Sequence, residues 1–390
     1  MSNKLTWILG RIKPLGKEDK EKFSRLSEYL RDKDRLKLIK SLLRQKKISI
    51  FLKNLDSNIT EEVSFPQIKA EADNIRVEKV NKSLKEKAVE SLYDRFSEKS
   101  FETITQMIAP NISGLDNIKK AAAIQLFSKQ PIHILLIGDP GTGKTEILRS
   151  AFNLSPVSSF GLGSGTSGAG LVVSVKGNSI VKGLLPLADE GICAIDELNL
   201  MKEENRAGLY NAMEKGFVTY DKGGKHYQFD ARVKVLATAN PKGDSVIEGS
   251  AEEIKKQMPF DSALLTRFHL VFLVRKPEGK NFKKVTESIV SGEKKELNQE
   301  DIGFVKDYIN HVNEHLGEVE FPKGLQQDVV NFIETLKKDE NDYLVDVGPR
   351  LVIGFMRLCK GLAVMEKRGQ VEEKDLERIK SIIKESLSLK

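Results

Sequence analysis

A glycine-rich turn that ends in a lysine and a threonine is the first place where this sequence could do chemistry. The turn has the form G-x-x-x-x-G-K-T and comprises, with the residue that follows it, Gly138, Asp139, Pro140, Gly141, Thr142, Gly143, Lys144, Thr145 and Glu146. Glycines allow such a turn to point its N–H groups at phosphate oxygens. Lys144 would reach the β- and γ-phosphates, and the Thr145 hydroxyl would ligate Mg²⁺. The turn therefore predicts a binding site for ATP and Mg²⁺.

Two acids and an amide at the ends of apolar runs are the next candidates. Asp196 and Glu197 end the segment GICAIDE, and Asn240 follows another apolar run. A strand beside the glycine-rich turn can deliver an acid to the Mg²⁺ shell, and a following glutamate can polarise the attacking water. We therefore expect Thr145 and Asp196 to hold the metal and Glu197 to act on water. The Asn240 amide would orient water or contact the γ-phosphate.

A predicted hairpin carries a lysine on either side of its tip. Residues 217–230 form two alternating arms around a Gly-Gly pair, and Lys222 and Lys225 flank these glycines. Lysines in this position can hold nucleic-acid phosphates. Lysines are also ordinary residues in a solvated turn. Lys222 and Lys225 are therefore candidate DNA contacts, with solvated turn residues as the alternative.

Apolar runs predict the strands that must position these groups. They cover residues 132–137, 192–195, 233–239 and 268–274. Helical patterns lie between them, so we expect a right-handed parallel α/β sheet. The glycine- and serine-rich residues 161–170 are predicted to be a flexible loop near the nucleotide. Residues 171–175 and 179–181 are predicted to pair as a second hairpin.

Helical periodicity dominates both ends of the chain. After Pro277 the predicted helices are 282–290, 299–316, 322–337, 349–368 and 372–388. Pro349 suits the first position of its helix. Before the α/β segment, residues 1–45 and 81–100 combine apolar residues at helical spacing with many charges. We expect three parts: a basic, mainly helical region at 1–100, an α/β core at 101–276 and a helical domain at 277–390.

Composition limits the class of protein and of partner. Of the 390 residues 39% are hydrophobic and 31% are charged, and no apolar run approaches a membrane span. We expect a cytosolic protein, or one at the nucleoid or in the nucleus if it is chromosomal. The two cysteines, Cys193 and Cys359, argue against a zinc ribbon and a disulfide framework. The net charge of +7 arises in the first 50 residues, which indicates either a polyanionic partner or a salt-bridged helical surface.

Together these segments resemble the AAA+ module of the minichromosome maintenance (MCM) proteins, the hexameric replicative helicases. The resemblance covers about residues 101–388 and includes IAPNISGLDNIKKAAAIQLF, GDPGTGKT, LADEGICAIDE, ATANP, LLTRF and PRLVIGFMRL. It implies an AAA+ fold with a helix-2 insert at 168–190, a hairpin before sensor 1 and a helical lid. It also implies binding to DNA, without a membrane, and assembly into a ring, which in this family is a hexamer.

The resemblance also assigns roles to single residues. Lys144 and Thr145 would be Walker A, Asp196 and Glu197 would be Walker B, and Asn240 would be sensor 1. Arg267 would be the arginine finger and Arg350 the sensor 2 arginine, both facing a neighbour's nucleotide. Lys222 would be the hairpin lysine that contacts DNA in the central channel.

Departures from the family pattern keep another function open. Leu198-Asn199-Leu200-Met201 follows Asp-Glu where the family usually has Phe-Asp-Lys-Met. The variant is similar to magnesium-chelatase and MoxR-type ATPases, which remodel proteins and share the insert and the hairpin. The region before the core is short and lacks zinc cysteines, as in a divergent or minimal MCM. We therefore expect a DNA helicase or translocase, with a remodelling ATPase or an accessory subunit of little helicase activity as alternatives.

Overall fold

The computed structural model describes residues 80–176, 179–222, 225–244, 249–276 and 297–389. The chain divides into two compact units, residues 1–96 and 97–390. The helix α6 (Val80–Ser97) agrees with the prediction of a charged helix at 81–100. The predicted helices at 1–45 and 282–290 lie outside the described residues, as does the start of the predicted helical domain at 277.

A parallel sheet forms the centre of the second unit. Within the described residues it has five strands in the order β2-β5-β8-β1-β9, which confirms the predicted α/β class. The strands are β2 (Ser158–Leu162), β5 (Ile192–Asp196), β8 (Lys234–Ala239), β1 (Ile134–Gly138) and β9 (Leu270–Val274). All residues of β1, β5 and β8 are buried, because helices cover a parallel sheet on both faces. This burial explains why their sequences are continuous apolar runs.

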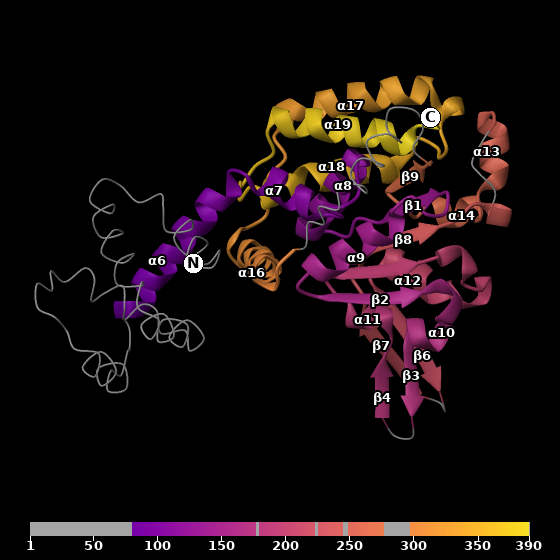
Figure 1. Cartoon of the computed structure of the whole chain (residues 1–390), viewed down its shortest axis with the longest axis horizontal. Helices are drawn as coiled ribbons and strands as arrows, with labels where there is room; N and C mark the ends of the chain where they lie inside the picture. The colour runs from indigo at the N-terminus through magenta and orange to yellow at the C-terminus, as the bar shows by residue number, and fades with distance from the viewer. Residues whose placement is uncertain (1–79, 177–178, 223–224, 245–248, 277–296, 390) are drawn as a thin grey trace, which may run out of the picture. The chain divides into compact units, whose positions relative to one another are not determined.

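Helices surround the sheet and form a separate layer at one side (Figure 1). Those around the sheet are α7 (Ser100–Met107), α8 (Asp116–Phe127), α9 (Lys144–Leu154), α10 (Gly168–Leu171), α11 (Leu184–Leu187), α12 (Ala207–Lys215), α13 (Ala251–Gln257) and α14 (Ser262–Leu265). The layer at one side contains α17 (Lys323–Lys338), α18 (Pro349–Met365) and α19 (Glu373–Leu387), whereas α16 (Gln299–His315) lies beside α9. Pro349 begins α18, as predicted.

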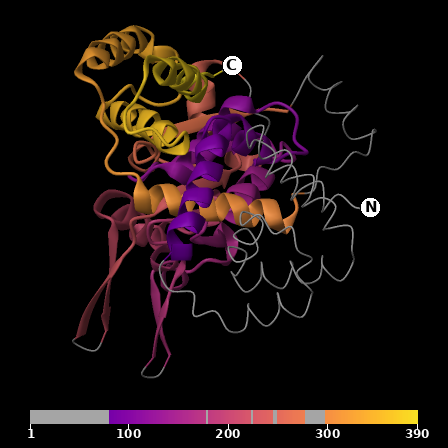
Figure 2. The same cartoon turned by 90° about the vertical axis from the view of Figure 1, so that its left-hand side faces the viewer.

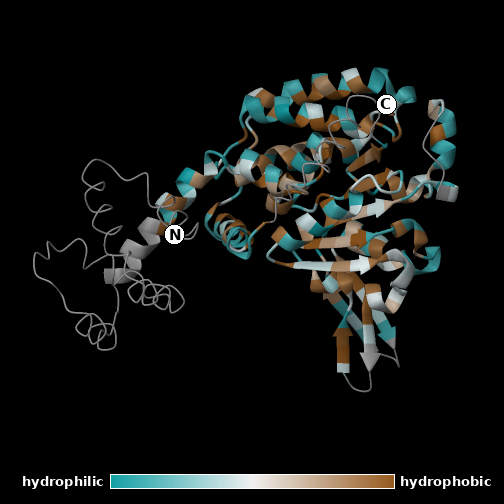
Figure 3. Cartoon of the chain, viewed as in Figure 1, coloured by the Kyte–Doolittle hydropathy of each residue, from teal (hydrophilic) through white to brown (hydrophobic). Residues whose placement is uncertain are grey.

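Hydropathy follows this layering (Figure 3). The strands of the sheet are mostly brown, with some white segments, whereas α17 alternates between hydrophobic and hydrophilic residues along its length. Its buried side chains are Val329, Phe332 and Leu336, which recur at the spacing of one helix face. The helix α17 therefore buries one stripe and leaves the opposite stripe to solvent, whereas α18 is buried on more than one face.

Two antiparallel hairpins project from the same side of the sheet layer (Figures 1 and 2). One pairs β3 (Val173–Lys176) with β4 (Ser179–Lys182). The other pairs β6 (Phe217–Lys222) with β7 (Lys225–Asp230), and Lys222 stands opposite Lys225 in the register. Both hairpins were predicted from the sequence.

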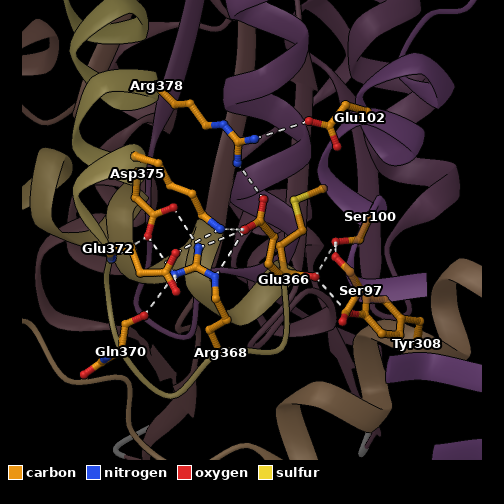
Figure 4. A network of polar contacts seen from close by, with 12 residues as sticks. Ser97, Ser100, Glu102, Tyr308, Glu366, Arg368, Gln370, Glu372, Asp375 and Arg378 are labelled. Carbon is orange, nitrogen blue, oxygen red and sulfur yellow. Dashed lines mark hydrogen bonds and ion pairs between the residues drawn. The ribbon is translucent and has the colours of Figure 1, made fainter. Parts of the chain in front are cut away.

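A network of charges joins α7 to the turn between α18 and α19 (Figure 4). Arg368 contacts the fully buried Asp375 at 2.7 Å and Glu366 at 3.0 Å. Arg378 extends the network, because it binds Glu366 at 2.6 Å and Glu102 on α7 at 3.3 Å. The hydrogen bond from Arg378 and the charge of Arg368 outweigh burial and lower the pKa of Glu366. These contacts fix the last two helices against the start of the unit.

The prediction of a flexible loop at 161–170 was wrong. The segment contains the end of β2, a 3-10 turn at Gly163–Gly165 and the start of α10. A Cβ atom at Gly163 would lie 2.1 Å from the Glu197 carbonyl oxygen. At this position glycine therefore allows a close backbone approach, which is different from flexibility.

Candidate functional site

The glycine-rich turn links the end of β1 to the start of α9. Gly141 and Gly143 have φ values of +76° and +87°, which favour glycine. The Lys144 ammonium group is buried and donates to the carbonyl oxygens of Gly138 at 2.8 Å and Asp139 at 2.7 Å. Burial lowers its pKa to about 8, against the opposing charges of Asp139, Asp196 and Glu197. The lysine is thus desolvated and held by neutral oxygens that an anion can replace.

The remaining residues of the turn have different surroundings. Asp139 is buried, and its Oδ2 accepts the N–H of Lys276 at 3.0 Å, which fixes the turn to the end of β9. Thr142 donates to the Asp139 carbonyl at 2.9 Å. Three residues are exposed: Pro140, Gly141 and Glu146.

The predicted acids lie at the same edge of the sheet as the turn. The Thr145 Oγ1 donates to the Asp196 Oδ1 at 3.2 Å. A hydroxyl oxygen and a carboxylate oxygen this close together are the type of ligands that Mg²⁺ accepts. Glu197 follows in the left-handed region, with φ 52° and ψ 47°. For a residue other than glycine this conformation is uncommon, and such residues cluster at functional sites.

Two polar residues that the sequence did not single out as functional join the acids to the next strand. Thr238 is buried beside Asp196, and its Oγ1 contacts both the Asp196 carboxylate and the Glu197 N–H. Asn199 accepts the backbone N–H of Asn240 at 3.0 Å. The backbone of Asn240 therefore lies beside the turn that follows the two acids, and its role as a sensor stays a prediction.

The two predicted arginines, Arg267 and Arg350, lie together in a cavity away from the glycine-rich turn. Arg267 and Arg350 both line a cavity of about 520 Å³, and Arg350 Nη1 donates to the Arg267 carbonyl at 3.0 Å. Burial, followed by the charge of Arg267, lowers the pKa of Arg350. Arg267 itself stacks 4.7 Å from the centre of the Tyr210 ring and lies 3.5 Å from Glu214. Two guanidinium groups in one cavity favour an anion.

The parallel register places this cavity at the opposite edge of the sheet from the glycine-rich turn. Ile134 pairs with Leu270 and Gly138 pairs with Val274, so Arg267 precedes the strand starts and the turn follows the strand ends. The four residue steps between these ends span about 13 Å at about 3.3 Å each. Among the described residues, the cavity lining contains none of the glycine-rich turn.

A buried pair of histidines lies next to the arginine cavity. The backbone N–H of His133 donates to His269 Nδ1 at 3.0 Å, and His133 Nε2 donates to the Met213 carbonyl at 3.2 Å. Arg357 Nη1 lies 3.2 Å from His269 Nε2. Burial lowers the pKa of His133 to about 3 and that of His269 to about 2, and nearby arginines act in the same direction. Both rings are therefore neutral at pH 7.

Comparison with protein families agrees with this arrangement. The model of the MCM P-loop domain matches residues 86–293, which is more than half of the chain. The chain belongs to the MCM family. The match to a P-loop domain agrees with the parallel sheet, which together with the helices that follow gives an α/β AAA+ core and a helical region.

Individual MCM proteins also match, two of them over a larger share of the chain than the P-loop domain. The DNA replication licensing factor MCM4 of Drosophila melanogaster is 30% identical in an alignment of 313 residues that covers 74% of this chain and 36% of the relative. The minichromosome maintenance protein MCM of Saccharolobus solfataricus is 30% identical in an alignment of 306 residues that covers 73% of this chain and 44% of the relative. The probable DNA helicase MCM8 of Arabidopsis thaliana is 34% identical in an alignment of 219 residues that covers 51% of this chain and 27% of the relative. The chain thus spans less than half the length of the relatives that it matches.

Two further observations concern partners of this MCM chain. The side chains of Lys222 and Lys225 lie outside the described residues, so their contact with DNA stays a prediction. Within the part of the chain that the structure describes, no helix is both long and apolar enough to cross a membrane.

Proposed function

We propose that this MCM chain is an ATP-hydrolysing DNA helicase or translocase that acts as a ring-forming motor in DNA replication. The observation that carries the proposal is the division of the ATP machinery between two edges of one sheet. Lys144, Thr145, Asp196 and Glu197 lie at the carboxyl ends of the strands, whereas Arg267 and Arg350 line a cavity at the opposite edge. A complete site then requires the edges of two subunits.

ATP fits the first edge for reasons of charge and geometry. The Lys144 ammonium group is desolvated, and phosphate oxygens would replace the carbonyl oxygens that it now contacts. Thr145 and Asp196 would hold Mg²⁺, because their oxygens already meet at 3.2 Å. When bound, the ion neutralises charge on the phosphates. Glu197 would take the proton of the attacking water, and Asn240 would orient that water.

A neighbouring subunit would supply the arginines. The Arg267 side chain is 25% exposed, and the ion pair of its Nη2 with Glu214 is long at 3.5 Å. Arg267 therefore still has donors to offer to a phosphate. A head-to-tail contact that repeats around an axis closes into a ring, in which each arginine edge completes the next ATP site. The ring in this family, a hexamer, is the expected assembly.

In such a ring, DNA would contact the hairpins. Lys222 and Lys225 end the two strands of one hairpin, and a second hairpin projects on the same side (Figure 2). A motor must hold any sequence, so point charges on backbone phosphates suit it better than side chains that recognise bases.

The test is the rate of Mg²⁺-dependent ATP hydrolysis with and without single-stranded DNA, followed by unwinding of a forked duplex. We expect DNA to stimulate hydrolysis and ATP to drive unwinding. Hydrolysis that DNA leaves unchanged, together with an intact fork, would contradict the helicase assignment. The protein-remodelling ATPase of magnesium-chelatase or MoxR type would then be the better description. Absence of any hydrolysis would favour an accessory subunit.

A further inference from the structure

Two polar side chains bridge the carboxyl ends of β5 and β8. Ile195 pairs with Ala237 in the parallel register, so the next residues, Asp196 and Thr238, stand side by side. The Thr238 Oγ1 donates its only proton to the Asp196 Oδ1 at 2.5 Å and accepts the N–H of Glu197 at 2.9 Å. Thr238 is 1% exposed, so water cannot replace either bond. One hydroxyl thus connects both acids of the site.

Asn199 makes the second bridge. The chain after Glu197 forms a 3-10 turn over Leu198–Leu200, and the N–H of Leu200 donates to the Glu197 carbonyl at 2.9 Å. This turn directs the Asn199 side chain at β8, where its Oδ1 accepts the N–H of Asn240 at 3.0 Å. The left-handed backbone at Glu197, which is uncommon for a residue with a Cβ, lies between the two bridges.

We propose that Thr238 and Asn199 are positioning residues that hold the Glu197 carboxylate and the Asn240 amide at a fixed separation. The inference rests on the proposed ATP hydrolysis and adds two residues to it. Thr238 fixes the backbone nitrogen of Glu197, and Asn199 fixes the backbone nitrogen of Asn240. Neither side chain needs to contact ATP. The two bridges act on the geometry of the groups that do.

This role accounts for the departure from the family pattern at Asn199. Only an acceptor oxygen is needed to receive the N–H of Asn240, and both asparagine and aspartate provide one. Asparagine provides it without a further negative charge beside Asp196 and Glu197. The Asn199 variant is therefore compatible with an MCM-type ATPase and does not require the chemistry of another family.

The experiment compares substitutions that keep the acceptor with substitutions that remove it, in the full chain. Asn199→Asp keeps an oxygen and Asn199→Ala removes it, while Thr238→Ser keeps the hydroxyl and Thr238→Val removes it. The matched control is Asn205→Ala, because Asn205 also accepts a backbone N–H, that of Gly168 at 2.9 Å, away from the acids. The measurements are kcat, ATP binding by the Glu197→Gln form of each variant, and the unfolding midpoint.

We expect Asn199→Ala and Thr238→Val to lower kcat by about 10- to 100-fold, the range for a misplaced catalytic group. ATP affinity should stay within a factor of about two, because the bridges orient the hydrolytic groups and not the phosphates. Asn199→Asp, Thr238→Ser and Asn205→Ala should retain most of the wild-type kcat. Thr238 is buried, so Thr238→Val could fail to fold. Asn199 is only half-buried, so Asn199→Asp and Asn199→Ala still test the inference in that case.

Any of four results would overturn the inference. Three concern kcat: a wild-type value in Asn199→Ala, an equal fall in Asn205→Ala, and an equal fall in Asn199→Asp and Asn199→Ala. Loss of ATP binding in step with kcat would also contradict it, because it would indicate a general structural defect. A wild-type protein that hydrolyses no ATP would instead refute the proposed function, and the positioning role would fall with it.

Discussion

Lys144 and Glu197 make separable contributions to the proposed reaction, one to binding and the other to proton transfer. Lys144→Ala removes the buried cation that faces the phosphates, so we expect ATP binding and hydrolysis both to be lost. Glu197→Gln keeps the shape of the side chain but not the base, so ATP should bind and not be hydrolysed. The measurements are nucleotide binding and Mg²⁺-ATPase rate, with the exposed Glu203→Gln as control. Full turnover in either variant would refute the assignment of its residue.

The buried histidine pair predicts how stability depends on pH. Unfolded histidine has a pKa of about 6.5, whereas the folded pKa values of His133 and His269 are about 3 and about 2. Below pH 6.5 the two histidines therefore bind protons in the unfolded state but not in the folded state. As pH decreases below 6.5, the free energy of unfolding should fall by up to about 1.4 kcal/mol per pH unit for each histidine. The two histidines make their full contribution to the free energy of unfolding above pH 6.5.

Chemical denaturation at pH 7, 5.5 and 4.5 measures this slope. His133→Asn should remove the share of the slope that His133 contributes, and the same substitution at the exposed His315 is the matched control. The same slope in wild type and His133→Asn would show that the His133 ring is already protonated in the folded state or does not affect folding.

At the scale of elements, the charge network between α7 and the turn before α19 predicts a large loss of stability on substitution. Asp375→Ala removes the fully buried partner of Arg368, which keeps Glu366 and Glu372, so we expect a loss of at most about 3–5 kcal/mol, the range for a broken buried pair. Glu377→Gln is the matched control, because Glu377 pairs with Lys380 at 2.6 Å on the surface, where such pairs contribute about 0–1 kcal/mol. Denaturation midpoints provide the comparison. Equal effects of the two substitutions would contradict a stabilising role for the network.

The elements also show which information the sequence carries. The apolar runs predicted β1, β5, β8 and β9 because buried parallel strands need apolar residues on both faces. The strand β2, with the sequence SSFGL, was missed because its strand conformation comes from pairing with β5 rather than from its own residue types.

The same reason applies to the candidate site. The glycine-rich turn and Asp196-Glu197 have a local pattern, so the sequence found them. Thr238 and Asn199 have no pattern of their own, because each acts on a residue of another strand. The register of β5 and β8 brings them to their partners.

At the scale of the whole molecule, the hairpin lysine should govern the response to DNA. We expect Lys222→Ala to weaken binding of single-stranded DNA and to flatten its salt dependence, because each lost phosphate contact reduces counterion release. Stimulation of ATP hydrolysis by DNA should fall as well. Lys215→Ala, at the exposed end of α12, is the control. Wild-type affinity and salt slope in Lys222→Ala would show that the hairpin does not hold DNA.

The central claim is that two subunits build each ATP site, and mixing two inactive proteins tests it most directly. A Lys144→Ala subunit has no ATP site of its own but keeps the Arg267 edge, and an Arg267→Ala subunit has the converse defect. In an equal mixture about one interface in four would join the two intact edges. A protein with both substitutions, mixed with Arg267→Ala, is the control that should stay inactive.

We predict that each single variant is inactive alone and that the mixture regains about a quarter of the wild-type rate per subunit. Sedimentation of the mixture would verify that rings have formed. The claim would be contradicted if Arg267→Ala hydrolysed ATP at the wild-type rate at all protein concentrations. It would also be contradicted if mixed rings assembled and showed no recovery.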